Sequence, residues 1–470
     1  MIWLLAALLV FFAGSAEATA RFMQNDGSTS GTCTTTGTAC RWDYLRTVIA
    51  CGDTVTMVDG TYQGANNMLN FNSLPPTNKV CTSGNEVTVS ATTDGGVFID
   101  GQMAREPFWI VGTQYWTFQN FDVGNSNDGV ITLQSSQHVT LKRICGSNNL
   151  NSDPGINVPV FYIDTSTNNT FEDLCLFGVG RNTFLDFTSA GLNTYRQIWL
   201  RHEGWHQGGG NQGTPVFQLG YGSLQSSLYE NIISIMATSE QMSSSETCAT
   251  DCFGSEVVRD ATPGGAPGDR ILGWIAYAKD NNRIPLHGAF MHVNNATTIS
   301  LTDVFVDVTA APVSSAVFGF QANQSGNAIT RATVIRAAGY GTSATSGATL
   351  SNFNECTTLG GCPNFYTGDT PGTGARNCFR YQDGTLTSTP LWPWPMDDRI
   401  KAALARANAA GTGGTALTGT AGSGYAASTV TSEIVSRYGS IPTACLTSSS
   451  FTPSFPVASD FPSVTVRDDF

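Results

Sequence analysis

Short stretches along the chain share one order of apolar and polar positions. Each stretch runs apolar, two polar residues, apolar, any residue, apolar, and the anchoring apolar residues recur at irregular intervals of 23 to 33 residues. A constant local pattern with variable spacing predicts strands of constant length joined by loops of variable length. The copies occupy residues 117–123, 140–146, 170–176, 194–200, 227–233 and 300–306, with a weaker copy at 330–336.

A second set of strands precedes the first, at residues 129–136, 159–166, 183–190, 215–222, 289–296 and 316–323. Apolar and polar residues alternate in these stretches, so one face of each strand should point inward. Each coil thus contains a strand, a short turn, two strands bent at a polar pair, and a long loop. Stacked coils of this kind predict an all-β fold, a parallel β-helix (solenoid). The predicted inward pairs are Ile131/Leu133, Phe161/Ile163, Leu185/Phe187, Phe217/Leu219 and Met291/Val293.

The N-terminal twenty residues predict a secretory signal peptide. An apolar run from Ile2 to Ala13 is followed by small residues, with A-x-A patterns that end at Ala18 and at Ala20. The run is short for a membrane span, and no other segment offers eighteen apolar residues. We therefore expect a secreted, extracellular protein without a membrane span.

All twelve cysteines follow this segment, and disulfides are the usual state of cysteines in secreted proteins. Cys145 and Cys175 occupy the same position in adjacent coils. Neighbouring strands lie about 4.8 Å apart, which suits a disulfide, so we expect this pair to join two coils. Two further pairs, close in sequence, are expected to staple loops: Cys248 with Cys252, and Cys356 with Cys362.

Three stretches at the start of the repeats resemble a known family. "CGDTVTMVDGTYQG" (51–64), "NEVTVSATTDGGVFIDGQ" (85–102) and "TQYWTFQNFDV" (113–123) are similar to the opening coils of the pectate-lyase-like superfamily, which includes alginate- and chondroitin-cleaving lyases. The resemblance implies a right-handed β-helix with an N-terminal cap. The expected organisation is a signal peptide (1–20), the cap (21–50), the β-helix (51–345), a loop-rich and helical region (346–410), a Gly/Thr/Ser-rich linker (411–429) and an unassigned segment (430–470). A helix of the C-terminal region would cover the exposed lower edge of the stack.

Residues 202–206 spell H-E-x-x-H, the pattern of zinc proteases. Zinc binding requires a helix, where residues four apart share a face. The repeat instead places this stretch in the loop after a coil's last strand, and Gly204 opposes a helix by about 1 kcal/mol. A zinc protease is therefore a remote alternative, and zinc is not expected. We assign His202, Glu203 and His206 to the wall of a substrate cleft.

The resemblance implies that substrate lies along the outer face of the first strand of each coil. Outward residues there include Asp164 and Asp186, which we expect to bind a cation such as Ca²⁺. β-elimination needs a cation beside the uronate carboxylate, a base for the C5 proton and an acid for the leaving oxygen. The expected catalytic residues are Lys279, Arg283, His292 and Tyr162, and the expected substrate-binding residues are His202, Glu203, His206, Gln218 and Asn294.

Charged residues at equivalent positions of successive coils form a second candidate site. Their signs alternate along the stack, which favours a structural ladder of ion pairs, although a lyase's basic and acidic cluster has the same composition. The members are Lys142-Arg143, Glu172-Asp173, Arg196-Gln197 and Tyr229-Glu230.

The net charge of −13 argues against nucleic acid or an anionic membrane as a partner. The sequence thus predicts an extracellular carbohydrate-active protein that cleaves an acidic, uronic-acid-containing polysaccharide by β-elimination. The alternative is a non-catalytic surface protein, an adhesin or structural component of the extracellular matrix, because no complete catalytic motif of the lyases is present. Polygalacturonase motifs are also incomplete.

Overall fold

A computed structural model describes most of the chain before residue 439. The described residues are 18–148, 159–178, 182–187, 191–202, 214–219, 226–236, 253–255, 258–260, 269–278, 284–285, 289–294, 299–309, 316–320, 327–336, 348–358, 378–409 and 429–438. No helix among them is long and apolar enough to cross a membrane.

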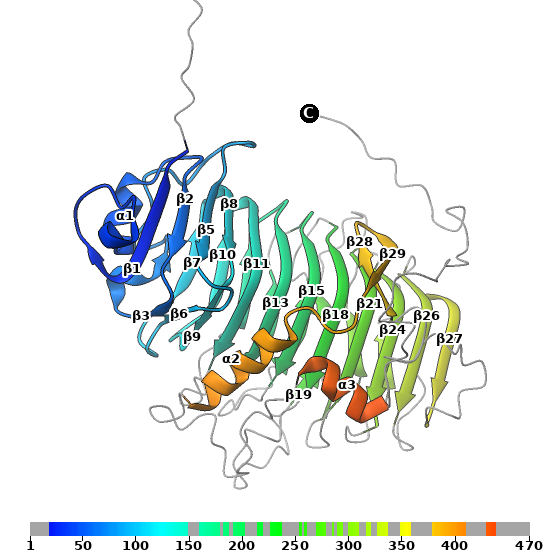
Figure 1. The fold of residues 1–470 in the computed structure, drawn as a ribbon. Coiled ribbons are helices and arrows are strands. Elements are labelled where there is room, and N and C mark those ends of the chain that lie inside the picture. Colours follow the sequence, from blue (N-terminus) through cyan, green and yellow to red (C-terminus); the bar gives the residue numbers. More distant parts are fainter. Residues whose placement is uncertain are drawn as a thin grey trace, which may run out of the picture.

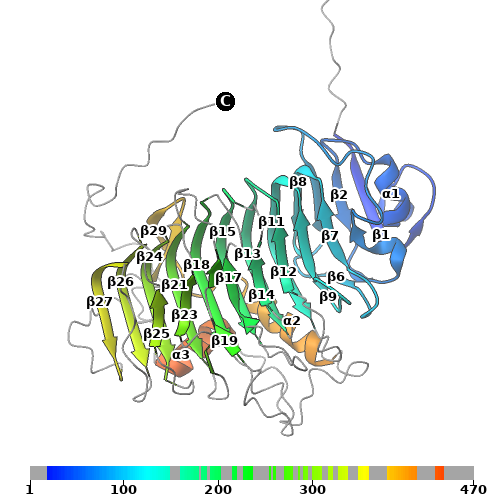
Figure 2. The same cartoon turned by 180° about the vertical axis from the view of Figure 1, so that it is seen from behind.

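Two long parallel sheets form the molecule, and their strands stack side by side along one axis (Figures 1 and 2). This confirms the predicted all-β parallel β-helix. Along its main path the larger sheet contains β1 (Ala20–Ser28), β2 (Thr54–Met57), β5 (Val87–Ala91), β8 (Gln114–Gln119), β11 (Gln137–Asn148), β13 (Thr170–Gly178), β15 (Thr194–His202), β18 (Leu228–Met236), β21 (Arg270–Ala278), β24 (Ser300–Val308), β26 (Asn327–Arg336) and β27 (Ala348–Cys356), with β3 (Gly60–Tyr62), β6 (Val97–Asp100) and β9 (Phe121–Gly124) beside them.

The second sheet provides the other wall of the solenoid. Its strands are β4 (Leu69–Asn70), β7 (Phe108–Val111), β10 (Ile131–Gln134), β12 (Pro159–Asp164), β14 (Asn182–Asp186), β17 (Phe217–Leu219), β20 (Val258–Asp260), β23 (Ala289–Asn294) and β25 (Ala316–Phe320). We call it the first-strand sheet, because it contains the first strand of each predicted coil. Three short strands form a small parallel sheet: β16 (Thr214–Pro215), β19 (Phe253–Ser255) and β22 (Ile284–Pro285).

The polar pair bends each long strand of the larger sheet, as predicted. The second residue of the pair has a positive φ in successive coils, near 55° at Arg143, Asp173 and Gln197. Most L-residues adopt this left-handed conformation at some cost. In most of the other coils the residue at this position is asparagine, aspartate or glycine. Those positions are Asn120, Asn231, Gly273, Asp303 and Asn352, while Arg331 is the exception.

Two predicted alignments were wrong by one residue. Phe184 and Asp186 point inward from β14, where we expected Leu185 and Phe187, because Phe184 pairs with Phe161 and Asp186 with Ile163. In the larger sheet Tyr229, rather than Leu228, is the partner of Tyr195. In both places two consecutive residues are apolar, so the alternation alone does not determine which of them faces the core.

The N-terminal region closes the first coil. β1 pairs in parallel with β2, and α1 (Trp42–Val48) buries Trp42 and Leu45 in the core. Disulfides join Cys33 to Cys40 and Cys51 to Cys81.

The predicted bridge between coils is confirmed. Cys145 and Cys175 are register partners on β11 and β13 and form a disulfide, with 4.5 Å between their Cα atoms. Cys356 is also disulfide-bonded. Cys248, Cys252 and Cys362 lie outside the described residues, so their predicted pairings stay predictions.

The C-terminal region covers a side of the solenoid. Helices α2 (Asp397–Ala409) and α3 (Val430–Tyr438) lie along the outer surface of the larger sheet (Figure 1), and not across the lower edge where we expected a helix. They bury an apolar stripe of that sheet, which includes Trp199, Ile233 and Tyr277. A hairpin of β28 (Phe379–Gln382) and β29 (Thr385–Pro390) packs farther along the same side. The burial of this stripe explains why strands of the larger sheet are apolar on both faces.

Candidate functional site

A row of side chains crosses the outer face of the first-strand sheet at equivalent positions. Register pairing aligns Asn70 with Trp109, Trp109 with Thr132, Thr132 with Tyr162, and Tyr162 with Leu185. The inward neighbours Phe108, Ile131 and Phe161 are fully buried in the core, which fixes the direction of this row. Asn70, Trp109, Thr132 and Tyr162 thus stand on four successive coils of a single face.

Two carboxylates meet where strands β7 and β10 of this face begin. Glu106 lies two residues before β7, and Asp128 lies in the turn before β10, where its Oδ1 accepts a hydrogen bond of 2.9 Å from the Gly129 amide. Partial burial, together with the charge of Asp128 and a hydrogen bond to it, raises the pKa of Glu106 to about 7. Glu106 therefore holds its proton at mildly acidic pH and exchanges it near neutrality.

Glu106 lines a pocket of about 260 Å³, which we call the Glu106 pocket. Arg105 and Asn127 contribute to its lining, and Asn70 Nδ2 lies 3.3 Å from Glu106 Oε2. Arg105 Nη1 donates a hydrogen bond to Gln102 Oε1. A guanidinium in the lining of a pocket can hold an anionic group through charge-assisted hydrogen bonds.

Tyr162 extends the polar surface toward the next coil. Burial, followed by the charges of Asp164 and Asp128, raises the pKa of Tyr162 to about 12. The phenol is thus protonated at neutral pH and can act as a proton donor rather than a base. Asp164 stands two residues farther along β12 and accepts hydrogen bonds from Gln134 Nε2 and Thr165 Oγ1.

The predicted metal pair does not form. Asp164 faces outward, but Asp186 is buried inside the solenoid, where it accepts 2.8 Å hydrogen bonds from the hydroxyls of Tyr195 and Tyr229. Within the described part of the chain, no group of three or more His, Cys, Asp and Glu side chains could hold a metal ion. The described residues therefore do not fit the expected Ca²⁺ site, and we derive no step through a cation.

The other predicted site residues have different outcomes. His202 is the last residue of strand β15 and is buried. It therefore does not line an open cleft, where we expected it. Glu203, His206, Lys279 and Arg283 lie outside the described residues. Gln218, His292 and Asn294 belong to strands of the first-strand sheet, β17 and β23.

The second candidate site is a structural ladder. Lys142, Glu172, Arg196 and Glu230 are register partners, and Arg196 Nε lies 2.9 Å from Glu230 Oε2. The predicted alignment of Tyr229 with Arg196 was wrong by one residue. The hairpin completes the ladder, because Asp383 pairs with Arg196 and the Gly384 amide donates to Glu230. Ion pairs occupy this face.

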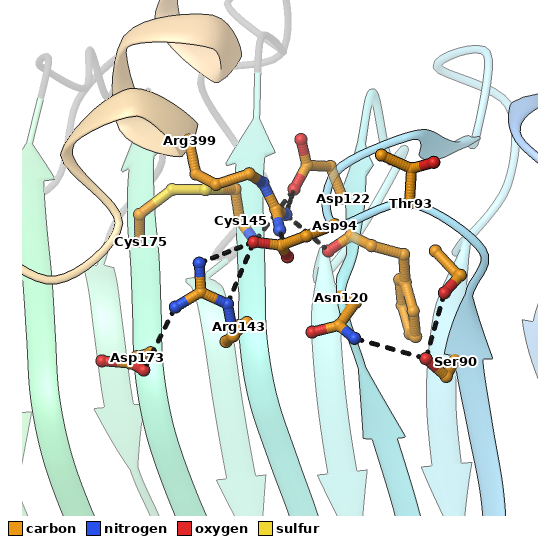
Figure 3. Close-up of polar contacts among 12 residues, drawn as sticks. Ser90, Thr93, Asp94, Asn120, Asp122, Arg143, Cys145, Asp173, Cys175 and Arg399 are labelled. Carbon is orange, nitrogen blue, oxygen red and sulfur yellow. Dashed lines mark hydrogen bonds and ion pairs between the residues drawn. A yellow bond between two sulfur atoms is a disulfide. The ribbon is translucent and has the colours of Figure 1, made fainter.

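A related network attaches α2 to the sheet (Figure 3). Arg143 pairs with Asp94 at 2.6 Å and with Asp173 at 3.6 Å. From α2, Arg399 pairs with both Asp94 and Asp122, next to the disulfide of Cys145 and Cys175. Asp122 is buried and also pairs with Arg406, so the arginines of α2 neutralise a buried carboxylate where the helix docks.

The Arg399→Ala variant should lose about 1.5–3 kcal/mol of stability, because Asp122 stays buried with one guanidinium fewer. Denaturant unfolding measures the loss, and limited proteolysis should cut the region after residue 390 faster than in the unmodified chain. The Lys401→Ala variant, at an exposed position of the same helix, is the control. Equal stability of the two variants would contradict the role of Arg399 in attaching α2 to the sheet.

Sequence reasoning missed Arg105, Glu106 and Asp128. The signal was present, because a carboxylate precedes the strand by two residues in "REPFWIV" and by three in "NDGVITL". The residues of β7 are not among the predicted first strands. The alignment therefore does not place the carboxylates before β7 and β10 on adjacent coils.

Comparisons with known proteins give remote structural similarity. No protein-family model matches the chain, and no curated protein matches it. Solved structures with similarity include a pectate lyase, Pel9A, at a TM-score of 0.45 and 14% identity, covering 72% of this chain and 80% of that one. An alginate lyase from Paenibacillus sp. strain FPU-7 gives 0.40 and 11%, covering 68% and 99%. A rhamnogalacturonan lyase gives 0.38 and 12%, covering 72% and 87%. The stacked parallel sheets themselves establish the architecture, which is a parallel β-helix.

Proposed function

We propose that the protein is a secreted polysaccharide lyase that cleaves a uronic-acid-containing polymer by β-elimination at the Glu106 pocket. The observation that carries the proposal is Glu106, whose pKa is raised to about 7 by burial and by the neighbouring Asp128, and which lines a pocket together with Arg105. A group with a pKa near the working pH is the most effective at general acid–base catalysis. The sequence resemblance to polysaccharide lyases selects elimination among the reactions that such a site can perform.

Each step has a residue of suitable chemistry. Arg105 would bind the uronate carboxylate and withdraw charge from it, which acidifies the C5 proton. Ionised Glu106 would take that proton, and electrons of the C5–H bond form the C4–C5 double bond as the C4–O bond breaks. Tyr162, still protonated at neutral pH, would donate its proton to the leaving oxygen. Trp109, on the same face, offers a ring against which the apolar side of a sugar can pack.

Glu106 is ionised when it acts as the base, so the pocket needs a positive charge to accept an anionic substrate. Arg105, which lines the same pocket, would supply it. In this proposal the positive charge beside the uronate carboxylate comes from an arginine of the chain rather than from a bound metal.

The test is incubation of the mature protein with pectate, alginate, chondroitin and rhamnogalacturonan, with and without EDTA. Absorbance near 235 nm should rise on at least one polymer, because elimination creates a conjugated double bond. EDTA should leave the rate unchanged if Arg105 is the cation. New reducing ends without this absorbance would indicate a hydrolase, and no cleavage by a folded protein would favour a non-catalytic binding protein.

A further inference from the structure

A second polar pocket, of about 360 Å³, lies at the junction of the N-terminal cap with the first coils. We call it the cap pocket. Asn25 and Asp26 from β1, Arg41 before α1, and residues 63–67 enclose it. Its lining is dominated by amide groups and has no large apolar side chain, so a hydroxyl-rich ligand suits it better than an apolar one.

Hydrogen bonds hold the walls of the cap pocket in place. Gln63 Nε2 donates to Asp100 Oδ2 at 2.8 Å, and Gln63 N donates to Asn25 Oδ1 at 2.8 Å. Gln102 Oε1 accepts from both the Gly64 amide and Arg105 Nη1, at 3.2 and 3.0 Å. Gln102 thus links a wall of the cap pocket directly to the arginine of the Glu106 pocket.

A buried acceptor in this lining points to a ligand that donates hydrogen bonds. Asn67 is 5% exposed, and its Nδ2 donates to Asn25 O, Asn25 Oδ1 and Gln63 O. These three acceptors fix the orientation of the amide. Asn67 Oδ1 is buried and has no hydrogen-bond partner within the described part of the chain. Buried polar atoms of native proteins normally have partners, and a sugar hydroxyl is a suitable donor.

The cap pocket is adjacent to the Glu106 pocket, because Ala65 lines both. We propose that the cap pocket is a second saccharide subsite, which binds a sugar unit of the chain being cleaved several units from the scissile bond. Arg41 is paired in a bidentate manner with Asp43, and Asp26 adds a negative charge, so the subsite favours sugar hydroxyls over a uronate carboxylate. This inference rests on the proposed function, and it predicts a substrate path that turns from the first-strand sheet toward the cap.

The test uses two variants, Ala65→Trp at the junction and Asn66→Ala in the cap pocket alone. Ala402→Trp, at an exposed position of α2, is the matched control. With oligosaccharides of increasing length from the polymer that is cleaved, we expect kcat/KM of the unmodified chain to rise with length. In Ala65→Trp the ratio of kcat/KM for long over short substrates should fall about tenfold, mainly through KM, and Asn66→Ala should lower it less. A length dependence that both variants retain would overturn the subsite.

Binding measurements separate this inference from the proposed function. The polymer panel is titrated calorimetrically into Glu106→Gln and into Glu106→Gln/Asn66→Trp, because Asn66 lines the cap pocket and not the Glu106 pocket. Weaker binding by the double variant supports the subsite even if no polymer is cleaved, which would refute only the lyase. Equal binding by both proteins would refute the subsite even if cleavage is found.

Discussion

The Glu106→Gln variant should lose cleavage activity by about 10²- to 10⁴-fold, the range that one general acid–base group contributes. Glutamine keeps the size of the side chain and can retain the contact with Asn70, but it cannot take a proton from C5. The loss should therefore appear in kcat, with a small change in KM. Initial rates from absorbance near 235 nm measure it. Glu86→Gln, at an exposed position away from the pocket, is the matched control.

The pH profile gives a second readout of the same residue. Because Glu106 acts as a base when ionised, activity should rise with pH through about 7, where its carboxyl group titrates. The charge of Asp128 contributes to the raised pKa, so Asp128→Asn should move the midpoint of that rise to lower pH. A purely structural role for Asp128 would reduce activity without moving the midpoint. An unchanged pH profile in both variants would refute the assignment of Glu106 as the base.

The repeat pattern was sufficient to predict the fold, because the order of apolar and polar residues in each coil indicates which of its side chains face the core. The bend at the polar pair and the bridge of Cys145 and Cys175 followed from aligning one coil with the next. The positions of α2 and α3 did not follow, because they depend on an apolar stripe on the outside of the larger sheet. Local periodicity shows that both faces of such a strand are apolar, but not which distant segment covers the outer one.

The candidate site was harder to predict because its residues lie beside the strands rather than in them. Glu106 and Asp128 occupy loop positions before β7 and β10, where no alternation marks the direction of a side chain. The raised pKa of Glu106 arises from its burial and from the nearby charge of Asp128, which a linear sequence does not display. The outward direction of Tyr162 could be predicted because it stands within a strand whose inward residues, Phe161 and Ile163, are unambiguous.

Asp186→Ala should destabilise the solenoid by about 2–5 kcal/mol, although the sequence suggested an exposed residue. Its carboxylate lies inside the coil and accepts hydrogen bonds from the hydroxyls of Tyr195 and Tyr229, whose stacked rings are 4.5 Å apart. Burial, followed by the charge of Asp186, raises the pKa of both tyrosines well above its ordinary value. Removing the carboxylate leaves two buried donors without this acceptor, at about 1–3 kcal/mol each.

Denaturant unfolding followed by circular dichroism measures the loss, and Asp164→Ala is the matched control on the outer face. We expect the control to lose less than about 1 kcal/mol, because Asp164 is half-buried and its partners can bind water. Combining Asp186→Leu with Tyr195→Phe and Tyr229→Phe should recover much of the stability, because all three polar groups are then replaced by apolar ones. If Asp186→Ala were as stable as Asp164→Ala, the two tyrosine hydroxyls would not depend on the Asp186 carboxylate as their acceptor. The inward position of an aspartate in β14 would then need another explanation.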